Sequence, residues 1–293
     1  GGTLTRLWAD PPTLDPHLTG DTTSAGVVVE IFSGLVALNT DLELVPDIAE
    51  SWDISGMGEV YTFRIRDDVT FHNGRKVTAA DFKWSLERAA SPKLASHLAE
   101  TYLNDIVGAT EYIDGEADSI KGITVIDDKT LQITVDAPKA YFLAKLTYPT
   151  AYVLDRETVE GGGRNWWVTD PVGTGPFKMS EYSIGERITL ERFGGYYRDP
   201  QPQLDTIQLN LAGGQAMAMY ENDEIDVTGV GLFDLERVLD PKEPLNKELT
   251  VAPPGFSVSY IGMNVAQPPF DDVNFRRALN HAIDKELIAK EVL

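Results

Sequence analysis

The sequence predicts an α/β protein that contains a β-rich module. Two observations carry this prediction. Strand-like alternation of apolar residues occurs near the start of the chain and again after residue 170, and both regions also contain helix-like patterns. Between them, about residues 41–170 consist of short strand patterns with a few helices. A chain of 293 residues, 42% of them hydrophobic, is long enough to bury the cores of two compact domains.

The first forty residues predict a strand, a rigid loop and a helix. Gly2–Trp8 alternates small or polar residues with apolar ones, which is typical of a strand. Pro11–Pro16 then breaks the strand into a loop. Thr22–Ser24 consists of residue types that cap helices, and apolar residues at helical spacing follow it. We therefore expect a helix to begin there and to end near Gly34.

Short strands and turns dominate the predicted module. Val60–Ile65 alternates as a half-buried antiparallel strand does. Asn73-Gly74 provides the positive φ that a tight turn requires, and Thr78–Asp81 has a capping pattern that begins a helix. Ile123–Val135 predicts a hairpin. We expect four aromatic side chains in the core: Trp52, Phe63, Phe71 and Trp84.

After residue 170 the strand pattern returns. Arg187–Arg192 and Thr206–Asn210 are the clearest strands. A helix over about Gly214–Glu221 precedes Glu224–Val227, which we interpret as a short buried strand. Asn274–Val292 carries apolar residues at helical spacing. No return strands follow this helix, so we expect a domain that is truncated.

The composition argues against several classes of function. A net charge of −21, from 46 acidic and 25 basic residues, repels phosphate backbones, so we expect no nucleic-acid partner. No apolar run is long enough to span a membrane, and no signal segment is visible in this chain. The absence of cysteine rules out disulfides, thiolate metal sites and cysteine nucleophiles.

Three blocks of sequence, in the same order and spacing, resemble the family-5 extracytoplasmic solute-binding proteins, the peptide/nickel/oligopeptide-binding components of ABC transporters. The first block comprises Pro46–Trp52, Tyr61–Gly74 and Val77–Phe82. The second comprises Gly173–Phe177, Ile188–Arg192 and Gly195–Tyr197. The third comprises Met263-Asn264, Pro269–Val273 and Phe275–Asp284. The chain departs from the family pattern at Gly194-Gly195 and at Glu221–Glu224.

The resemblance implies a periplasmic-binding-protein-like fold of class II, cluster C, with two lobes joined by a hinge. Residues 1–40 and 171–258 would form a lobe I subdomain with a mixed sheet, and 41–170 the inserted β-rich subdomain. Residues 259–293 would form the hinge crossing and the first helix of a largely missing lobe II. The chain would then be the N-terminal portion of such a protein.

The same resemblance implies a function in transport without enzymatic activity. The protein would capture a peptide or similar small polar solute between its lobes and deliver it to the permease subunits of an ABC importer. We expect a bacterial monomer in the periplasm, or at the cell surface as a lipoprotein, with no cofactor and no metal. The choice among peptide, nickel chelate and oligosaccharide stays open.

Three segments are candidates for the ligand site. The helix start Asp21, Thr22, Thr23 and Ser24 offers backbone N–H groups and hydroxyls, although a simple helix cap explains it as well. Gly255, Phe256 and Ser257 precede the lobe crossing, where we expect an extended backbone to pair with an extended peptide; an ordinary hinge-side strand with Phe256 or Tyr260 in the core is the alternative. Trp167 follows three glycines and is suited to stacking on a ligand, with packing over the loop as the alternative.

Two other classes stay open as alternatives. A secreted hydrolase with a pair of carboxylates is compatible with 46 acidic residues, although no G-x-S-x-G or H-E-x-x-H motif occurs. Asp114–Asp118 has alternating oxygen ligands but lacks the glycine and glutamate of a calcium loop. A sensor or chaperone-like binding protein of the same fold is the other alternative.

His17 beside Asp15 is interpreted as a loop histidine held by a carboxylate.

Overall fold

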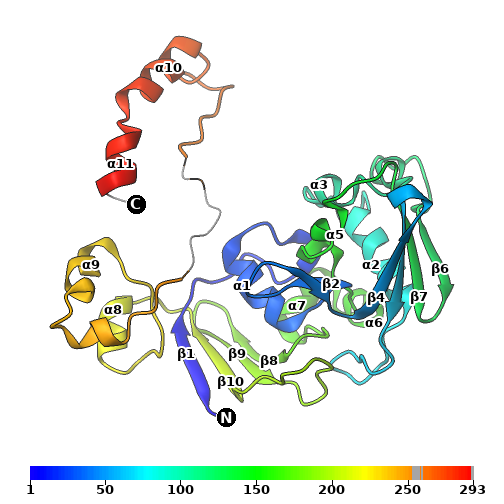
Figure 1. The fold of residues 1–293 in the computed structure, drawn as a ribbon, viewed down its shortest axis with the longest axis horizontal. Coiled ribbons are helices and arrows are strands. Elements are labelled where there is room, and N and C mark those ends of the chain that lie inside the picture. The colour runs from blue at the N-terminus through cyan, green and yellow to red at the C-terminus, as the bar shows by residue number, and fades with distance from the viewer. Residues whose placement is uncertain (253–257, 259, 292–293) are drawn as a thin grey trace. The chain divides into compact units, whose positions relative to one another are not determined.

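The computed structural model describes residues 1–252, 258 and 260–291 (Figure 1). The chain divides into two compact units, Gly1–Thr228 and Gly229–Leu293. Within the described residues, every helix is too short or too polar to cross a lipid bilayer.

A four-stranded mixed sheet forms in the first unit from segments far apart in the sequence. Its order is β1 (Thr3–Leu7), β10 (Thr206–Asn210), β9 (Arg187–Arg192) and β8 (Phe177–Ser183), as Figure 1 shows. β1 and β10 run parallel, whereas the other neighbours are antiparallel. The three strands that the alternation predicts here are confirmed. Parallel pairing across about 200 residues places the carboxyl ends of β1 and β10 at one edge of the sheet.

The β-rich module contains a second, wholly antiparallel sheet. Its order is β4 (Ala49–Ser55), β5 (Val60–Ile65), β7 (Thr130–Thr134) and β6 (Ile123–Asp127), and a separate hairpin joins β2 (Val36–Leu38) to β3 (Leu44–Pro46). The hairpin that the sequence predicts over Ile123–Val135 is confirmed, since β6 and β7 pair antiparallel. Gly74 has a φ of 86°, as the predicted Asn-Gly turn requires.

The helices complete the two units. Those of the first unit are α1 Thr22–Ile31, α2 Ala79–Ala90, α3 Ala99–Leu103, α4 Ala109–Ile113, α5 Phe142–Lys145, α6 Arg156–Gly162, α7 Trp166–Thr169 and α8 Ala216–Glu221. The second unit contains α9 Leu232–Leu239, α10 Val273–Ala282 and α11 Lys285–Glu291. Short 3-10 helices include Pro16–Leu18 and Pro149–Ala151.

Three sequence predictions of local structure were wrong. Glu224–Val227 forms only an isolated bridge, between Val227 and Arg6, and Val227 is half exposed rather than buried. The predicted helix over Asn274–Val292 is two helices, since Asp284 caps α11 by accepting a hydrogen bond from the amide of Leu287. Two of the three glycines before the tryptophan pair lie in α6 rather than in a loop.

Two glycines, rather than the predicted Gly34, determine how α1 ends. The helix stops at Ile31, and the carbonyl of Ile31 accepts a hydrogen bond of 2.8 Å from the amide of Gly175. A Cβ on Gly173 would overlap that carbonyl oxygen, and one on Gly175 would overlap the carbonyl oxygen of Glu30. Only glycine allows this approach of one backbone to another.

Each sheet supports its own hydrophobic core. One core lies in the β-rich module and includes the fully buried Phe63 and Phe71, with Trp52 packed at its edge. The other lies between α1 and the mixed sheet and includes Val28, Ile188 and Leu190, with Trp84 at its edge. Phe63 and Phe71 are therefore core residues as predicted, whereas the two tryptophans are only partly buried because they lie at the core edges.

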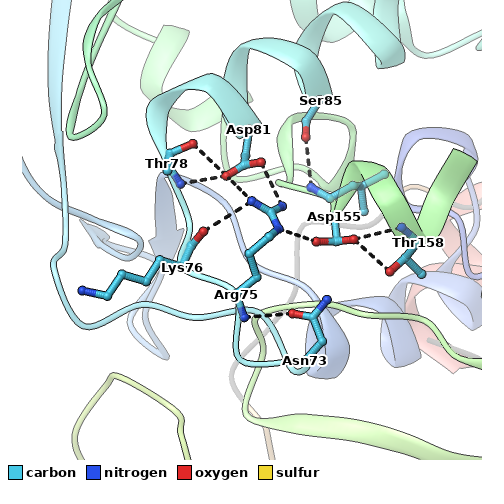
Figure 2. Close-up of polar contacts among 9 residues, drawn as sticks. Asn73, Arg75, Lys76, Thr78, Asp81, Ser85, Asp155 and Thr158 are labelled. Atoms are coloured by element: carbon cyan, nitrogen blue, oxygen red, sulfur yellow. Dashed lines mark hydrogen bonds and ion pairs between the residues drawn. The ribbon is translucent and has the colours of Figure 1, made fainter.

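Arg75 joins two helix starts (Figure 2). Its Nη2 lies 2.9 Å from Oδ1 of Asp81, and its Nε lies 2.7 Å from Oδ2 of Asp155. Asp81 accepts hydrogen bonds from the amide and the hydroxyl of Thr78 at the start of α2. Asp155 caps α6 through the amide and hydroxyl of Thr158. The one guanidinium thus ties α2 of the β-rich module to α6.

We expect Arg75→Met to destabilise the protein by about 3 kcal/mol, because it removes the cation that compensates the fully buried carboxylate of Asp155. Denaturant unfolding measures this loss. Arg187→Met is the matched control: its pair with Glu181 is exposed on both sides, so the loss is below about 1 kcal/mol. Equal losses in the two variants would contradict a structural role for the Arg75 contacts.

Candidate ligand-binding site

A pocket of about 620 Å³ lies where β1 and β10 end and α1 begins. In α/β sheets, ligands bind outside the carboxyl ends of parallel strands, and the volume is in the range of small-molecule sites. The pocket is lined by Leu7, Trp8, Ala9, Asp10, Thr22, Thr23, Leu211, Gly213 and Gly214.

The first turn of α1 forms one wall of this pocket. Asp21 is the helix cap, and its Oδ1 accepts a hydrogen bond of 2.8 Å from the amide of Ser24. Thr22 and Thr23 line the pocket, so their hydroxyls are available at the positive end of the helix dipole. The cap and the pocket wall are therefore the same short segment, and the two sequence interpretations of it are compatible.

Trp8 forms a second wall and is fixed against α1. Its Nε1 donates a hydrogen bond of 3.0 Å to the carbonyl of Thr23, and the guanidinium of Arg6 lies 4.3 Å from its ring centre. A Cβ on Gly26 would lie 2.6 Å from Cζ2 of Trp8. The absence of a side chain at Gly26 therefore allows the indole to pack on the helix.

Asp10 forms a third wall and is held by two donors. The hydroxyl of Tyr182 donates to Oδ1 at 2.5 Å, and the amide of Gly185 donates to Oδ2 at 2.7 Å. Burial and the charge of Asp10 raise the pKa of Tyr182, so its phenol stays neutral and acts as a donor. Trp167 packs at a tilt on Tyr182, with the ring centres 6.3 Å apart.

The structure brings together only part of the predicted site. Thr22 and Thr23 line the pocket, Asp21 caps the helix beside them, and Ser24 is fully buried. Trp167 is half buried against the core that lies on the mixed sheet. The remaining candidates Gly255, Phe256 and Ser257 lie outside the described residues.

Sequence reasoning missed Trp8, Asp10 and the pair Gly213-Gly214 as pocket residues. Trp8 and Asp10 directly follow the predicted first strand, so the rule about strand ends contained a signal for them. The glycines required the pairing of β10 with β1, which no local pattern reveals. Both glycines have positive φ, of 79° and 153°, where other residues are strained.

A buried polar network lies behind α1. Arg88 of α2 pairs with Asp15 through Nη1 at 3.0 Å and Nη2 at 2.5 Å, and Trp166 donates to the same carboxylate at 3.2 Å. The ring of His17 lies 2.9 Å from Nη1 of Arg88 through Nδ1 and 3.0 Å from the carbonyl of Tyr152 through Nε2. These contacts assign the imidazole proton to Nε2, because arginine is only a donor.

Charge and burial explain how this network is ionised. Burial of Asp15 opposes its ionisation, but the hydrogen bonds and charge of Arg88 hold the pKa of this carboxyl below its usual value. Burial, and then the charge of Arg88, lower the pKa of His17 to about 4. The ring is thus neutral and structural. The carboxylate of Asp15 holds His17 as predicted, but it does so by accepting a hydrogen bond of 3.1 Å from the backbone amide of His17 rather than from its ring.

Within the described residues, no group of three or more His, Asp or Glu side chains is arranged to hold a metal ion.

The comparisons with known proteins agree on one family. The family described as bacterial extracellular solute-binding proteins, family 5 Middle, matches residues 43–293. The chain belongs to this family. The probable deoxycholate-binding periplasmic protein YgiS of Escherichia coli K12 is 31% identical over 97% of the chain and 54% of its own length. The periplasmic oligopeptide-binding protein OppA of the same strain is 30% identical over 95% of the chain and 52% of its own length.

A solved structure supports the fold of this family-5 chain. The murein tripeptide binding protein MppA of Escherichia coli superimposes with a TM-score of 0.88 at 27% identity, over 99% of the chain and 57% of that structure. The α/β fold of the periplasmic binding proteins is therefore confirmed. The chain spans about half the length of the curated relatives it matches. The predicted boundaries at residues 40, 170 and 258 stay predictions.

We expect Gly26→Ala to displace Trp8. Alanine normally stabilises a helix by about 1 kcal/mol relative to glycine, but the added Cβ forces the indole away and breaks its bond to Thr23. The stability gain is thus cancelled, and the indole N–H resonance of Trp8 shifts in NMR spectra. Gly161→Ala in α6, where a Cβ meets no atom within 4 Å, keeps the gain and leaves that resonance in place. The opposite pattern would refute the packing of Trp8 on α1.

Stability should depend on pH through His17. Its pKa is about 4 in the folded protein and 6.5 for an unperturbed histidine, so the unfolded chain binds more protons between these values. The free energy of unfolding therefore falls as pH drops from 6.5 to 4, by up to about 1.4 kcal/mol per pH unit for this group. Burial lowers the pKa of His72 to about 4 as well, so its contribution has the same sign.

Urea unfolding of the wild type and of His17→Gln between pH 4.5 and 7 tests this expectation. The variant should lose about half of the slope, and the double variant with His72→Gln most of it. An unchanged slope in His17→Gln would show that the imidazole is not buried in its neutral form.

Proposed function

We propose that this chain forms part of a substrate-binding protein that captures peptides for an ABC importer, and that the pocket between β1, β10 and α1 contacts the peptide. The observation that carries the proposal is the presence of two predicted ligand residues, Thr22 and Thr23, in a pocket at the strand ends of a family-5 chain. Delivery to a membrane permease and a location outside the cytoplasm are parts of the same proposal.

The chemistry of the pocket supports binding rather than catalysis. Its polar groups are two threonine hydroxyls, the end of a helix and the carboxylate of Asp10, which is held by Tyr182 and Gly185. Its apolar groups are Leu7, Trp8 and Leu211. Hydrogen-bonding groups beside apolar walls fix an orientation and bury side chains, as ligand sites do.

Two features support an extended peptide over a compact solute in this proposal. A Cβ on Gly213 would meet no atom within 4 Å, so this turn leaves room for a ligand backbone. The names of two relatives point the same way: OppA is an oligopeptide-binding protein and MppA a murein tripeptide binding protein. YgiS carries the name of a deoxycholate-binding protein, which makes a bile acid the competing ligand.

We expect isothermal titration calorimetry to show weak binding of trialanine to this chain, since solute-binding proteins close two lobes on their ligand. The double variant Thr22→Val and Thr23→Val should bind about thirtyfold more weakly, because two hydrogen bonds of about 1 kcal/mol each are lost. Thr101→Val, on an exposed position of α3, should bind as the wild type does.

Two results would oppose the proposal. Binding of deoxycholate with no binding of trialanine would replace the peptide by a bile acid. Hydrolysis of trialanine that disappears on substitution of one acidic residue would support the alternative of a secreted hydrolase.

A further inference from the structure

A second pocket, of about 340 Å³, lies at the other end of α1. The first residues of α1 line the pocket described above, whereas this one is reached by Val29 of α1 and by Phe32 and Ser33 that follow the helix. A helix of ten residues is about 15 Å long, so the two pockets are separate. The second pocket is lined by Val29, Phe32, Ser33, Ala37, Leu38, Asp47, Thr147, Tyr152, Pro176, Tyr196 and Arg198.

A charged group is built into one wall of the second pocket. The carboxylate of Asp47 is almost fully buried and accepts a hydrogen bond of 2.6 Å from the hydroxyl of Tyr197. Nη1 of Arg198 lies 3.4 Å from the same oxygen, which is long for a hydrogen bond to a charged group. A guanidinium has five N–H donors, so this contact leaves donors for a second acceptor.

A second feature of this pocket is the hydroxyl of Tyr152, which is independent of the contact between Asp47 and Arg198. The residue is only 9% exposed, and its ring packs on Gly34, where a Cβ would lie 3.0 Å from Cδ1. Its hydroxyl makes no hydrogen bond to any of the residues that the structure describes, yet it is not one of the fully buried atoms that lack a partner, so it is open to the pocket that the residue lines. The phenol is near Asp47 and Tyr196, both in the pocket wall.

The phenols that line this pocket are hydrogen-bond donors at neutral pH. Burial, and then the charge of Asp47, raise the pKa of Tyr152. Burial, and then the charge of Asp47, raise the pKa of Tyr196 to about 12. At neutral pH the phenols of Tyr152 and Tyr196 are thus protonated and able to donate.

We propose that this second pocket binds a small organic carboxylate with one ring-sized apolar group. Arg198 receives the carboxylate, Tyr152 and Tyr196 donate hydrogen bonds to it, and Val29, Phe32 and Leu38 contact the apolar group. The volume suits a ligand of this size. The proposal concerns a site at the opposite end of α1 and does not depend on peptide binding at the first.

Benzoate is the probe, with the chain as described and saturation-transfer NMR and calorimetry as readouts. We expect benzoate to bind, benzyl alcohol to bind at least about tenfold more weakly and benzylamine not at all, since a hydrogen bond to a charged group is worth about a factor of ten or more. Arg198→Met should abolish binding of benzoate, and Tyr152→Phe should weaken it about fivefold without removing the ring that packs on Gly34.

The control is Arg187→Met, the same change at an arginine that pairs with Glu181 on the exposed end of β9 and does not line the pocket. It should bind benzoate as the wild type does. Binding of benzylamine in preference to benzoate would overturn the proposal, because Asp47 would then be the recognition group. Benzoate binding that is equal in Tyr152→Phe and the wild type would overturn it as well, and this variant covers the case in which Arg198→Met fails to fold.

Discussion

The buried ion pair between Asp15 and Arg88 is the constraint on which the rest of the first unit depends. It joins the loop before α1 to α2, and so it connects the mixed sheet with the β-rich module through charged hydrogen bonds rather than apolar contact alone. A buried pair of this kind is costly to break, because either partner alone is left as an uncompensated charge. His17 accepts from Arg88 and Trp166 donates to Asp15, so both charged groups make further hydrogen bonds within the protein.

With that loop fixed, α1 is held at both ends. Asp21 caps its first turn by accepting from the amide of Ser24, and the amide of Gly175 donates to the carbonyl of Ile31 where the helix ends. The space around each end is therefore defined by rigid groups: the threonines and Trp8 at the start, Tyr152 and Arg198 near the end. A helix with hydrogen bonds at both ends is a suitable base for recognition, since a preorganised site loses little entropy on binding.

Local patterns explain how much of this could be predicted from the sequence. The strands Thr206–Asn210 and Val60–Ile65 and the cap at Asp81 are visible in alternation and in residue type, which act over a few neighbours. Trp8, Asp10 and Arg88 were not recognised as site or network residues, because their roles arise from partners 15 to 172 positions away. The isolated bridge at Val227 shows the same limit: the strand-like pattern of Glu224–Val227 pairs with the edge strand β1 only through Val227 and Arg6, and it forms no strand.

The parallel pairing of β1 with β10 also has a consequence for how the chain acquires its fold. Contacts between Thr3 and Thr206 close a very long loop, whereas the sheet of the β-rich module consists of antiparallel neighbours much closer in sequence. Contacts of long sequence separation form slowly because loop closure costs entropy before the contact compensates it. During synthesis on the ribosome, the first strand therefore stays unpaired until more than two hundred residues have emerged. An unpaired strand edge can associate with other chains, and chaperones prevent such association.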